Sequence, residues 1–460
     1  MQSKILVAAL ACAFAWPASA TADNTQLAAE LAALQEQIAQ MRTAYEGRIA
    51  ALEEKLAAAD KRRADDATTP AQTASQARSQ APVAHGGASA FNPEISLILQ
   101  GAYKRAKEVE ERHIGGFVGA AHHHDGDEHG DDKRGFLLDH SELVLAANID
   151  PHFRGQTTVA LLDGEAELEE AWFQTTSLGH GVGIRAGRFF SGIGYLNEQH
   201  AHQWDFYEQP LMYKALFGEH GYSQDGVQLK WVAPLATFLE FGAEIGRGQN
   251  FPGTERNLNG ANSRALFAHV GGDIGTSSSW RAGLSWLQTR AEERENHFES
   301  EVFGEAHGAF SGRSRVWIAD FVYKWAPDGN PARRNFKLQA EYFHRKENGH
   351  LAVEDEESPW RTRQSGYYLA GVYQFTPNWR AGLRYDRLDS GRQFLGDNPA
   401  GIEIEHYQPR RVSAMVDYSW SEFSRLRLQL SRDRAMPGVI DNQVMLQYVM
   451  SLGSHGAHKF

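Results

Sequence analysis

From residue 91 to residue 460, the sequence alternates apolar and polar residues with a period of two, in one segment after another. In the segment from Val316 to Trp325, for example, Trp317, Ala319 and Phe321 share one face. Successive side chains of a strand point to opposite faces, so each such segment would have one apolar and one polar face. About 16 segments of roughly 9 to 13 residues fit the length and alternation of transmembrane strands. The sequence therefore predicts an all-β fold, a transmembrane antiparallel β-barrel of about 16 strands.

The connections between these segments support the same fold. Short connections fall at Asp150-Pro151, Ala233-Pro234 and Thr376 to Asn378, whereas long ones fall near 290–313 and 346–364. Outer-membrane barrels alternate short periplasmic turns with long external loops. Several aromatic residues also stand at segment ends, where a membrane interface favours them: Trp231, Phe238, Trp280, Trp325, Trp379 and Trp420.

The first 90 residues lack this alternation and divide into three parts. Residues 1–20 combine Lys4, a short apolar run and small residues ending at Ala20, which is typical of a secretory signal peptide. Residues 21–60 carry a heptad seam and predict a short α-helical coiled coil in the periplasm, and residues 61–90 resemble a flexible linker. The seam residues are Leu27, Leu31, Leu34, Ile38, Met41, Tyr45, Ile49, Leu52 and Leu56. We expect the helix to pair with other copies of itself, with a trimer favoured, or to pack on the barrel rim.

Charge, cysteine content and motifs exclude several classes of function. The net charge of -12 argues against a nucleic-acid partner. The one cysteine, Cys12, lies within the signal peptide, so the mature chain would have no disulfide and no cysteine-bound metal. No Walker loop, GxSxG or HExxH motif is present, and we predict no catalytic site and no required cofactor.

Two long connections carry residues that bind divalent metals. The first external loop holds a dense histidine and acid tract, in which flexible imidazoles and carboxylates would bind Zn²⁺ loosely. A solvated acidic loop of no specific use is the alternative. The candidate ligands in this tract are His122, His123, His124, Asp127 and His129.

The third external connection, from Phe189 to Asp225, is the longest. It contains His200, His202 and Asp205, and two imidazoles with a carboxylate can hold Zn²⁺. Further polar residues would make it a constriction loop, namely Glu198, Glu208 and His220. The alternative is that these groups line a wet constriction and hydrogen-bond to the barrel wall.

Basic residues recur on the polar face of the C-terminal segments. A ring of arginines in a lumen favours anions, although Arg–carboxylate pairs that brace the wall would use the same residues. The residues of this lumenal basic wall are Lys337, Arg345, Arg380, Arg384, Arg411, Arg425 and Arg427.

The order of signal peptide, coiled coil, linker and barrel resembles the phosphate-selective porin O/P type of channel. The stretch from Gly187 to His202, GRFFSGIGYLNEQHAH, is more similar to proteins labelled as zinc-regulated outer-membrane receptors. That resemblance implies a role in zinc acquisition and dependence on TonB. Plugged TonB-type barrels have about 22 strands, however, and here only a helix and a linker precede the barrel, which leaves TonB in doubt.

These observations together predict an outer-membrane, porin-like channel for small solutes or ions, linked to divalent metal uptake, with Zn²⁺ loosely bound or transported. An anion porin selected by the lumenal arginines and a closed, surface-binding barrel remain alternatives. Expected partners are outer-membrane lipid, further copies of the chain, and the barrel-assembly machinery, which would read the terminal Phe460.

Overall fold

The computed structural model divides the chain into two compact units, Met1–His85 and Gly86–Phe460. The residues that it describes all belong to the second unit. They are residues 93–109, 112–118, 133–162, 165–302, 304–354, 356–398, 400–404 and 406–453. The predicted signal peptide, coiled coil and linker, the terminal Phe460 and the histidine tract at 122–129 lie outside these residues.

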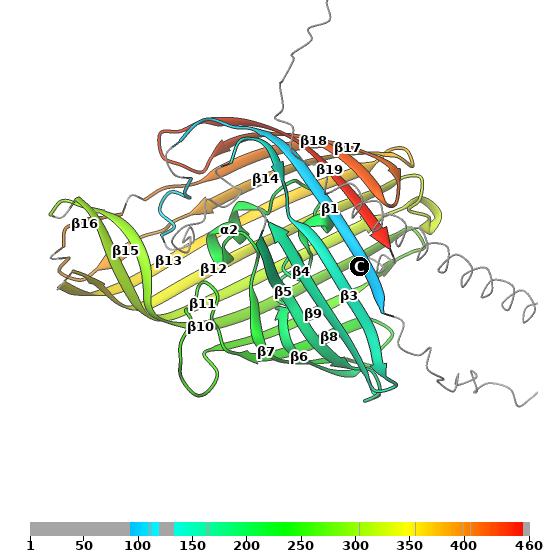
Figure 1. The fold of residues 1–460 in the computed structure, drawn as a ribbon, viewed down its shortest axis with the longest axis horizontal. Coiled ribbons are helices and arrows are strands. Elements are labelled where there is room, and N and C mark those ends of the chain that lie inside the picture. The colour runs from blue at the N-terminus through cyan, green and yellow to red at the C-terminus, as the bar shows by residue number, and fades with distance from the viewer. Residues whose placement is uncertain are drawn as a thin grey trace, which may run out of the picture. The chain divides into compact units, whose positions relative to one another are not determined.

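Sixteen antiparallel strands form the wall of a closed barrel (Figure 1). They are β1 (Glu94–Arg105), β3 (Ser141–Asp150), β4 (Phe153–Leu162), β5 (Glu165–Thr175), β6 (Val182–Phe190), β7 (Ser223–Val232), β8 (Phe238–Gly246), β9 (Ser263–Ile274), β10 (Ser278–Ser300), β11 (Gly304–Trp325), β12 (Asn335–Val353), β13 (Glu356–Gln374), β14 (Trp379–Asp389), β17 (Arg410–Ser421), β18 (Ser424–Arg434) and β19 (Asp441–Gly453). Three shorter segments pair at their edges: β2 (Gly135–Leu138), β15 (Gln393–Leu395) and β16 (Ile402–Glu403).

Pairing between the first and the last strand closes the barrel. β1 runs antiparallel to β19 from Ser96 opposite Gly453 to Arg105 opposite Val444. Every other wall strand pairs with its neighbour in the chain, so no edge is left open. The predicted 16-stranded antiparallel barrel is confirmed.

Apolar side chains cover the outer surface, as the period of two predicts. Trp317 and Phe321 of β11 are 48% and 40% exposed, whereas Asp320 between them is 4% exposed and faces inward. An outward apolar band with a polar interior is the arrangement that a bilayer requires of a barrel. The fold is that of a closed antiparallel β-barrel with an apolar outer surface.

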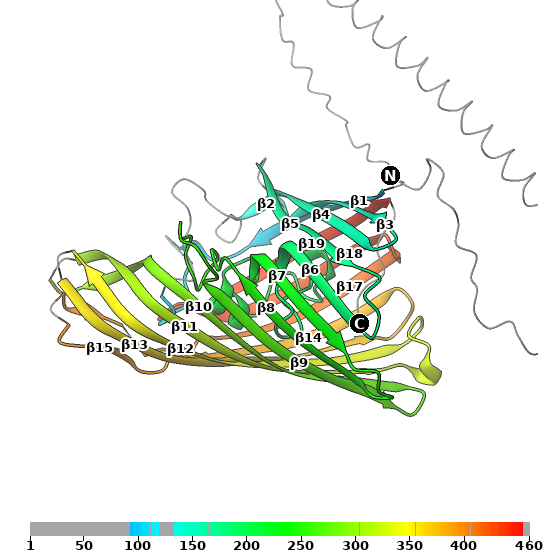
Figure 2. The ribbon, with the colours of Figure 1, turned by 90° about the horizontal axis from the view of Figure 1, so that it is seen from below.

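The strands β10 to β13, of 19 to 23 residues each, continue far beyond the others at one end of the barrel (Figures 1 and 2). The expectation of long irregular connections near 290–313 and 346–364 is wrong, because β10 to β13 extend through these regions and end in tight hairpins. Apolar residues on the inner face of this extension hold it together by packing into a second core. Its large members are Phe298, Phe310, Leu351, Trp360 and Ile402.

The connection between β6 and β7, residues 191–222, folds into the barrel, and we call it the plug loop. It contains the short helices η1 (Ala201–Gln203) and α2 (Leu211–Phe217), and α2 lies inside the ring of strands in Figure 1. Leu211, Met212 and Leu216 are fully buried against lumenal wall residues. A one-turn helix, η2 (Pro327–Gly329), lies between β11 and β12, and no helix of the described residues is long and apolar enough to span a bilayer.

Candidate metal site in the barrel lumen

Carboxylates of the wall hold the plug loop by its backbone. The Glu244 carboxylate on β8 accepts hydrogen bonds from Ser191 Oγ at 2.6 Å and from Gly192 N–H at 2.9 Å. Glu341 on β12 accepts from the N–H groups of Tyr195 and Leu196, at 3.0 and 3.2 Å. Three of these contacts satisfy backbone donors that folding has removed from water, and the fourth satisfies the Ser191 hydroxyl. The path of the loop is therefore fixed from the wall.

The lumenal basic wall binds the same loop. Arg345 donates to the carbonyl of Ala215 at 3.1 Å, and Arg427 donates to that of Trp204 at 2.9 Å. The other five also contact the loop, at Asp205, Glu208 or a backbone carbonyl: Lys337, Arg380, Arg384, Arg411 and Arg425.

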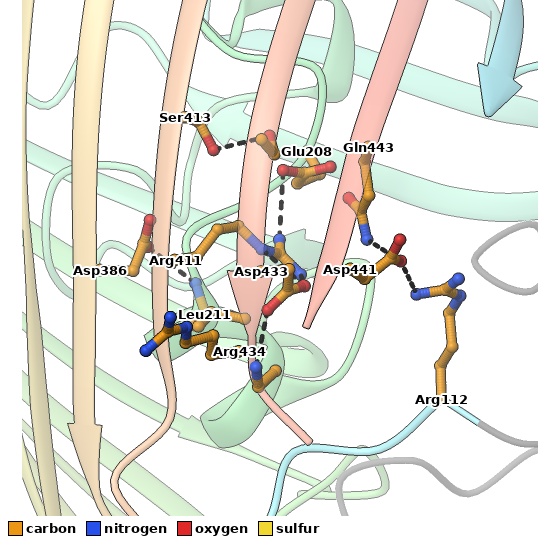
Figure 3. Close-up of polar contacts among 12 residues, drawn as sticks. Arg112, Glu208, Leu211, Asp386, Arg411, Ser413, Asp433, Arg434, Asp441 and Gln443 are labelled. Carbon is orange, nitrogen blue, oxygen red and sulfur yellow. Dashed lines mark hydrogen bonds and ion pairs between the residues drawn. The ribbon is translucent and has the colours of Figure 1, made fainter. Parts of the chain in front are cut away.

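Figure 3 shows one such contact in detail. The Arg411 guanidinium on β17 lies between Asp433 of β18 and Glu208 of the plug loop, with Nε donating to Asp433 Oδ2 at 2.9 Å and Nη1 lying 3.1 Å from Glu208 Oε1. Charge-assisted pairs of this kind are the stronger hydrogen bonds of proteins. They leave this guanidinium engaged with protein groups on both sides.

Imidazoles and carboxylates from four chain segments also meet in one cluster. Its members are His140, Glu142, Glu169, Glu170, His200, His202 and His220. His140 precedes β3 and Glu142 lies on it, the two adjacent glutamates lie on β5, and the other three histidines belong to the plug loop. We call this group the lumen cluster.

A β-bulge explains how two successive glutamates reach the lumen. The register between β4 and β5 shifts after Thr158, which pairs with Glu170, so that Val159 pairs with Leu168 and Glu169 is the additional residue. Neighbouring side chains of a regular strand alternate faces, but a bulge redirects one of them. Glu169 and Glu170 are consequently both buried.

The distances place His200 among three carboxylates. Its Nδ1 lies 3.2 Å from an oxygen of Glu142 and 3.2 Å from one of Glu169, and its Nε2 lies 3.0 Å from Glu170. His202 Nδ1 lies 3.0 Å from the second oxygen of Glu142. The plug loop thus contacts β3 and β5 through its histidines.

His140 and His220 extend the cluster on the other side of Glu169. His140 Nε2 lies 2.9 Å from Glu169 Oε1, and the rings of His140 and His220 are 5.7 Å apart. Two triplets each offer three ligand atoms within 4.8 Å of one another, and Glu169 belongs to both. They are His140, Glu169 and His220, and Glu142, Glu169 and His200.

The electrostatics of the cluster favour a cation. Burial lowers the pKa of His200, but the carboxylates around it, Glu142 first, outweigh burial and hold that pKa well above its ordinary value. Burial also opposes protonation of His140, yet its hydrogen bond to Glu169 raises the pKa to about 9. Carboxylates at this spacing therefore stabilise positive charge, which protons on the imidazoles or a bound metal ion can supply. Imidazole nitrogens and carboxylate oxygens are ligands that Zn²⁺ accepts.

The predicted site residues separate into two groups. His200, His202 and His220 meet in the lumen cluster, whereas Asp205 pairs with Lys337 and Arg380, at 3.1 Å from the latter. Two further plug-loop acids also bind cations of the wall: Glu198 lies 2.9 Å from Lys230 Nζ, and Glu208 contacts Arg384 and Arg411.

Sequence reasoning missed the ligands that the wall contributes. His140 and Glu142 lie two residues apart in the stretch His140-Ser141-Glu142, and Glu169-Glu170 stands at the middle of β5. The available signal was the presence of charged residues beside apolar residues within a strand. The bulge that turns both glutamates inward, however, has no signature in a single sequence.

Comparison with solved structures reveals similar barrels. OmpT of Vibrio cholerae, in a form lacking loop L8, is 13% identical, with coverage of 78% of this chain and 99% of that one and a TM-score of 0.49. The outer-membrane channel DcaP of Acinetobacter baumannii is 13% identical, with coverage of 78% and 97% and a TM-score of 0.46. The anion-selective porin from Comamonas acidovorans is 9% identical, with coverage of 78% and 99% and a TM-score of 0.46. Similarity at this level does not indicate a solute for this protein.

Sequence comparison gives a nearer relative. No family model matches the chain. An uncharacterised protein of Aquifex aeolicus (strain VF5) is 33% identical over 396 residues, which cover 81% of this chain and 80% of that protein. Identity at this level over most of both chains indicates common descent, and the chain belongs to the same family as this Aquifex aeolicus protein.

Proposed function

We propose that this protein is an outer-membrane channel for divalent metal ions of the zinc class, which bind in transit at the lumen cluster. The observation that carries the proposal is the convergence of imidazoles and carboxylates around Glu169, with ligand atoms within 4.8 Å of one another. The cluster joins the plug loop to the wall, so an ion bound there would occupy the boundary between the loop and the strands.

The plug loop supports a metal ion rather than an anion as the solute. All seven residues of the lumenal basic wall contact the loop, and Arg345, Arg384 and Arg427 are at most 2% exposed. A guanidinium that is committed to protein carbonyls and carboxylates offers little to a passing anion. The carboxylates of the lumen cluster, in contrast, surround imidazoles. A bound metal ion can supply the positive charge that protons on these imidazoles would otherwise supply.

Zinc binding to the purified barrel tests this proposal. The tract at 122–129 would also bind zinc, so the protein should carry alanine at His122, His123, His124 and His129. In that background, Glu169→Gln should weaken lumenal zinc binding at least tenfold, because both ligand triplets include this carboxylate. The matched control is Glu165→Gln, an exposed position on the same strand, which should bind zinc as the background does.

Zinc titration by calorimetry provides the measurement. Equal affinities for the Glu169→Gln variant and its control would contradict a lumenal metal site.

A closed barrel that binds metal without passing it is a second candidate function, which the close packing of the plug loop favours. Zinc flux across a lipid bilayer separates the two, because only a channel delivers the ion to the far side.

A further inference from the structure

A second group of ligand atoms lies elsewhere on the wall, on β9 and β11. Asp320 of β11 and His269 of β9 are 4% and 2% exposed, and both face the lumen. Neither oxygen of the Asp320 carboxylate has a hydrogen-bond partner, and nor does His269 Nε2. A buried polar atom without a hydrogen-bond partner destabilises the fold, and more so when the group is charged. Three such atoms in one place indicate that something else satisfies them.

Gly283 of β10 leaves a space between these two side chains. It pairs with His269 on one side and with Asp320 on the other, so the three residues form one row across β9, β10 and β11. A Cβ at this position would lie 2.1 Å from Asp320 Oδ2 and 2.6 Å from His269 Cδ2, the ring carbon next to Nε2. The carboxylate and the Nε2 edge of the imidazole therefore approach the same small space above the glycine.

The groups around this space orient the histidine and add negative charge. His269 Nδ1 lies 3.0 Å from Glu240 on β8, and such a carboxylate behind a histidine is the usual outer partner of a metal ligand. Asp320 also stands directly opposite Glu341 of β12, and like charges in that position repel. The guanidinium of Arg281 interacts electrostatically with Asp320 and donates its hydrogen bond to Gly194 O of the plug loop, at 3.2 Å.

We propose that Asp320 and His269 form a second site for a divalent metal ion, with Glu240 as the positioning residue of His269. Water completes the coordination, since the wall supplies one imidazole and one carboxylate. That the ion is zinc-like rests on the proposed function. The plug loop touches both sites, because Gly194 contacts the residues around the second and His200 belongs to the first. The lumen then offers an ion two binding positions along one loop.

Crystals of the full-length protein soaked in zinc chloride test the site directly, with diffraction measured at the zinc absorption edge. An anomalous peak about 2.0–2.1 Å from His269 Nε2 and about 2.0–2.2 Å from an Asp320 oxygen is the expected result. A water molecule in that position, without anomalous signal at millimolar zinc, would overturn the proposal.

Zinc counting separates this proposal from the proposed function. In the background without the four external histidines, Asp320→Asn should remove one bound zinc and Glu169→Gln another, whereas the exposed Asp328→Asn should remove none. An unchanged count for Asp320→Asn overturns the second site, and an unchanged count for Glu169→Gln overturns the lumen cluster alone. Glu240→Gln should weaken the second site about 10–100-fold.

Gly283→Ala gives an independent check, because its added methyl group would lie 2.1 Å from Asp320 Oδ2 and would displace the carboxylate from the space beside His269. This variant should bind one zinc ion fewer. On a denaturing gel, the unheated protein should still migrate as a folded barrel. A folded Gly283→Ala protein that retains both zinc ions would contradict the placement of the site.

Discussion

The plug loop is attached to the wall glutamates mainly through His200. Its imidazole contacts carboxylate oxygens of Glu142, Glu169 and Glu170, all of which are buried. Removal of one partner from a buried ion pair leaves the other charge uncompensated, which costs more than the pair contributes when intact. The histidine thus has a structural role without metal and a ligand role with it.

His200→Ala should accordingly release the plug loop as well as weaken zinc binding. A loss of about 3 kcal/mol, typical of a broken buried pair, corresponds to about hundredfold faster hydrogen exchange in residues 191–222. His350→Ala, at an exposed position, is the control and should leave exchange in the loop unchanged. Identical exchange in both variants would mean that other contacts alone hold the loop.

The difference between the ligands that sequence reasoning found and those that it missed is physical. His200 and His202 stand in a long connection, where polar residues close in sequence stay close in space whatever the loop does. Glu142 and Glu169 come from separate strands, and their meeting depends on barrel closure, on a bulge and on the inward path of the loop. The sequence predicts the barrel and a constriction loop, but it gives no sign of the bulge that turns both Glu169 and Glu170 inward.

At the scale of elements, the plug loop is held by hydrogen bonds that carboxylates accept. Glu244 accepts from Ser191 and Gly192 of the plug loop region and also from the amides of Gln224 and Gln228, at 3.1 and 2.7 Å. Four donors converge on two oxygens, an arrangement that an anion alone satisfies.

Glu244→Gln should loosen the start of the plug loop, because its amide would bring two donors toward groups that also donate. We expect a larger single-channel conductance than in wild type, with the barrel still folded. The control is Glu357→Gln, at an exposed position of the outer hairpin. Planar-bilayer recording decides, and a conductance equal to that of the control would argue that Glu244 does not hold the loop closed.

The outer extension of β10 to β13 has a core of its own, centred on Phe310, which is fully buried. Phe310→Ala should cost about 3–5 kcal/mol there and fray the extension without unfolding the barrel. Faster hydrogen exchange in the outer halves of β10 and β11, with unchanged exchange in β17 and β18, is the expected pattern. Uniform acceleration in all strands would show instead that the extension and the barrel unfold together.

The period of two was sufficient to predict the barrel wall, but not the outer extension of β10 to β13. Lipid imposes strict alternation on the membrane part of each strand, which is why about 16 strands were predictable. Beyond the bilayer no lipid constrains the outward residues, so charged runs such as Glu292 to Glu295 are typical of loops. Inward apolar residues such as Phe298 nevertheless keep β10 in place.

At the scale of the whole molecule, oligomerisation stays a prediction from the heptad seam at residues 21–60. If copies of this segment pair, its deletion should convert trimers into monomers in detergent, while the barrel remains folded. Light scattering measures the mass. An unchanged oligomer after the deletion would assign the assembly to the barrel instead.

In the function that we propose, metal ions of the zinc class cross the barrel by way of the lumen cluster. Zinc flux into liposomes that contain the full chain and an internal fluorescent zinc indicator tests it most directly. We expect uptake well above that of empty liposomes, reduced at least tenfold by Glu169→Gln and unaffected by Glu165→Gln. No uptake, or equal uptake by both variants, would contradict it.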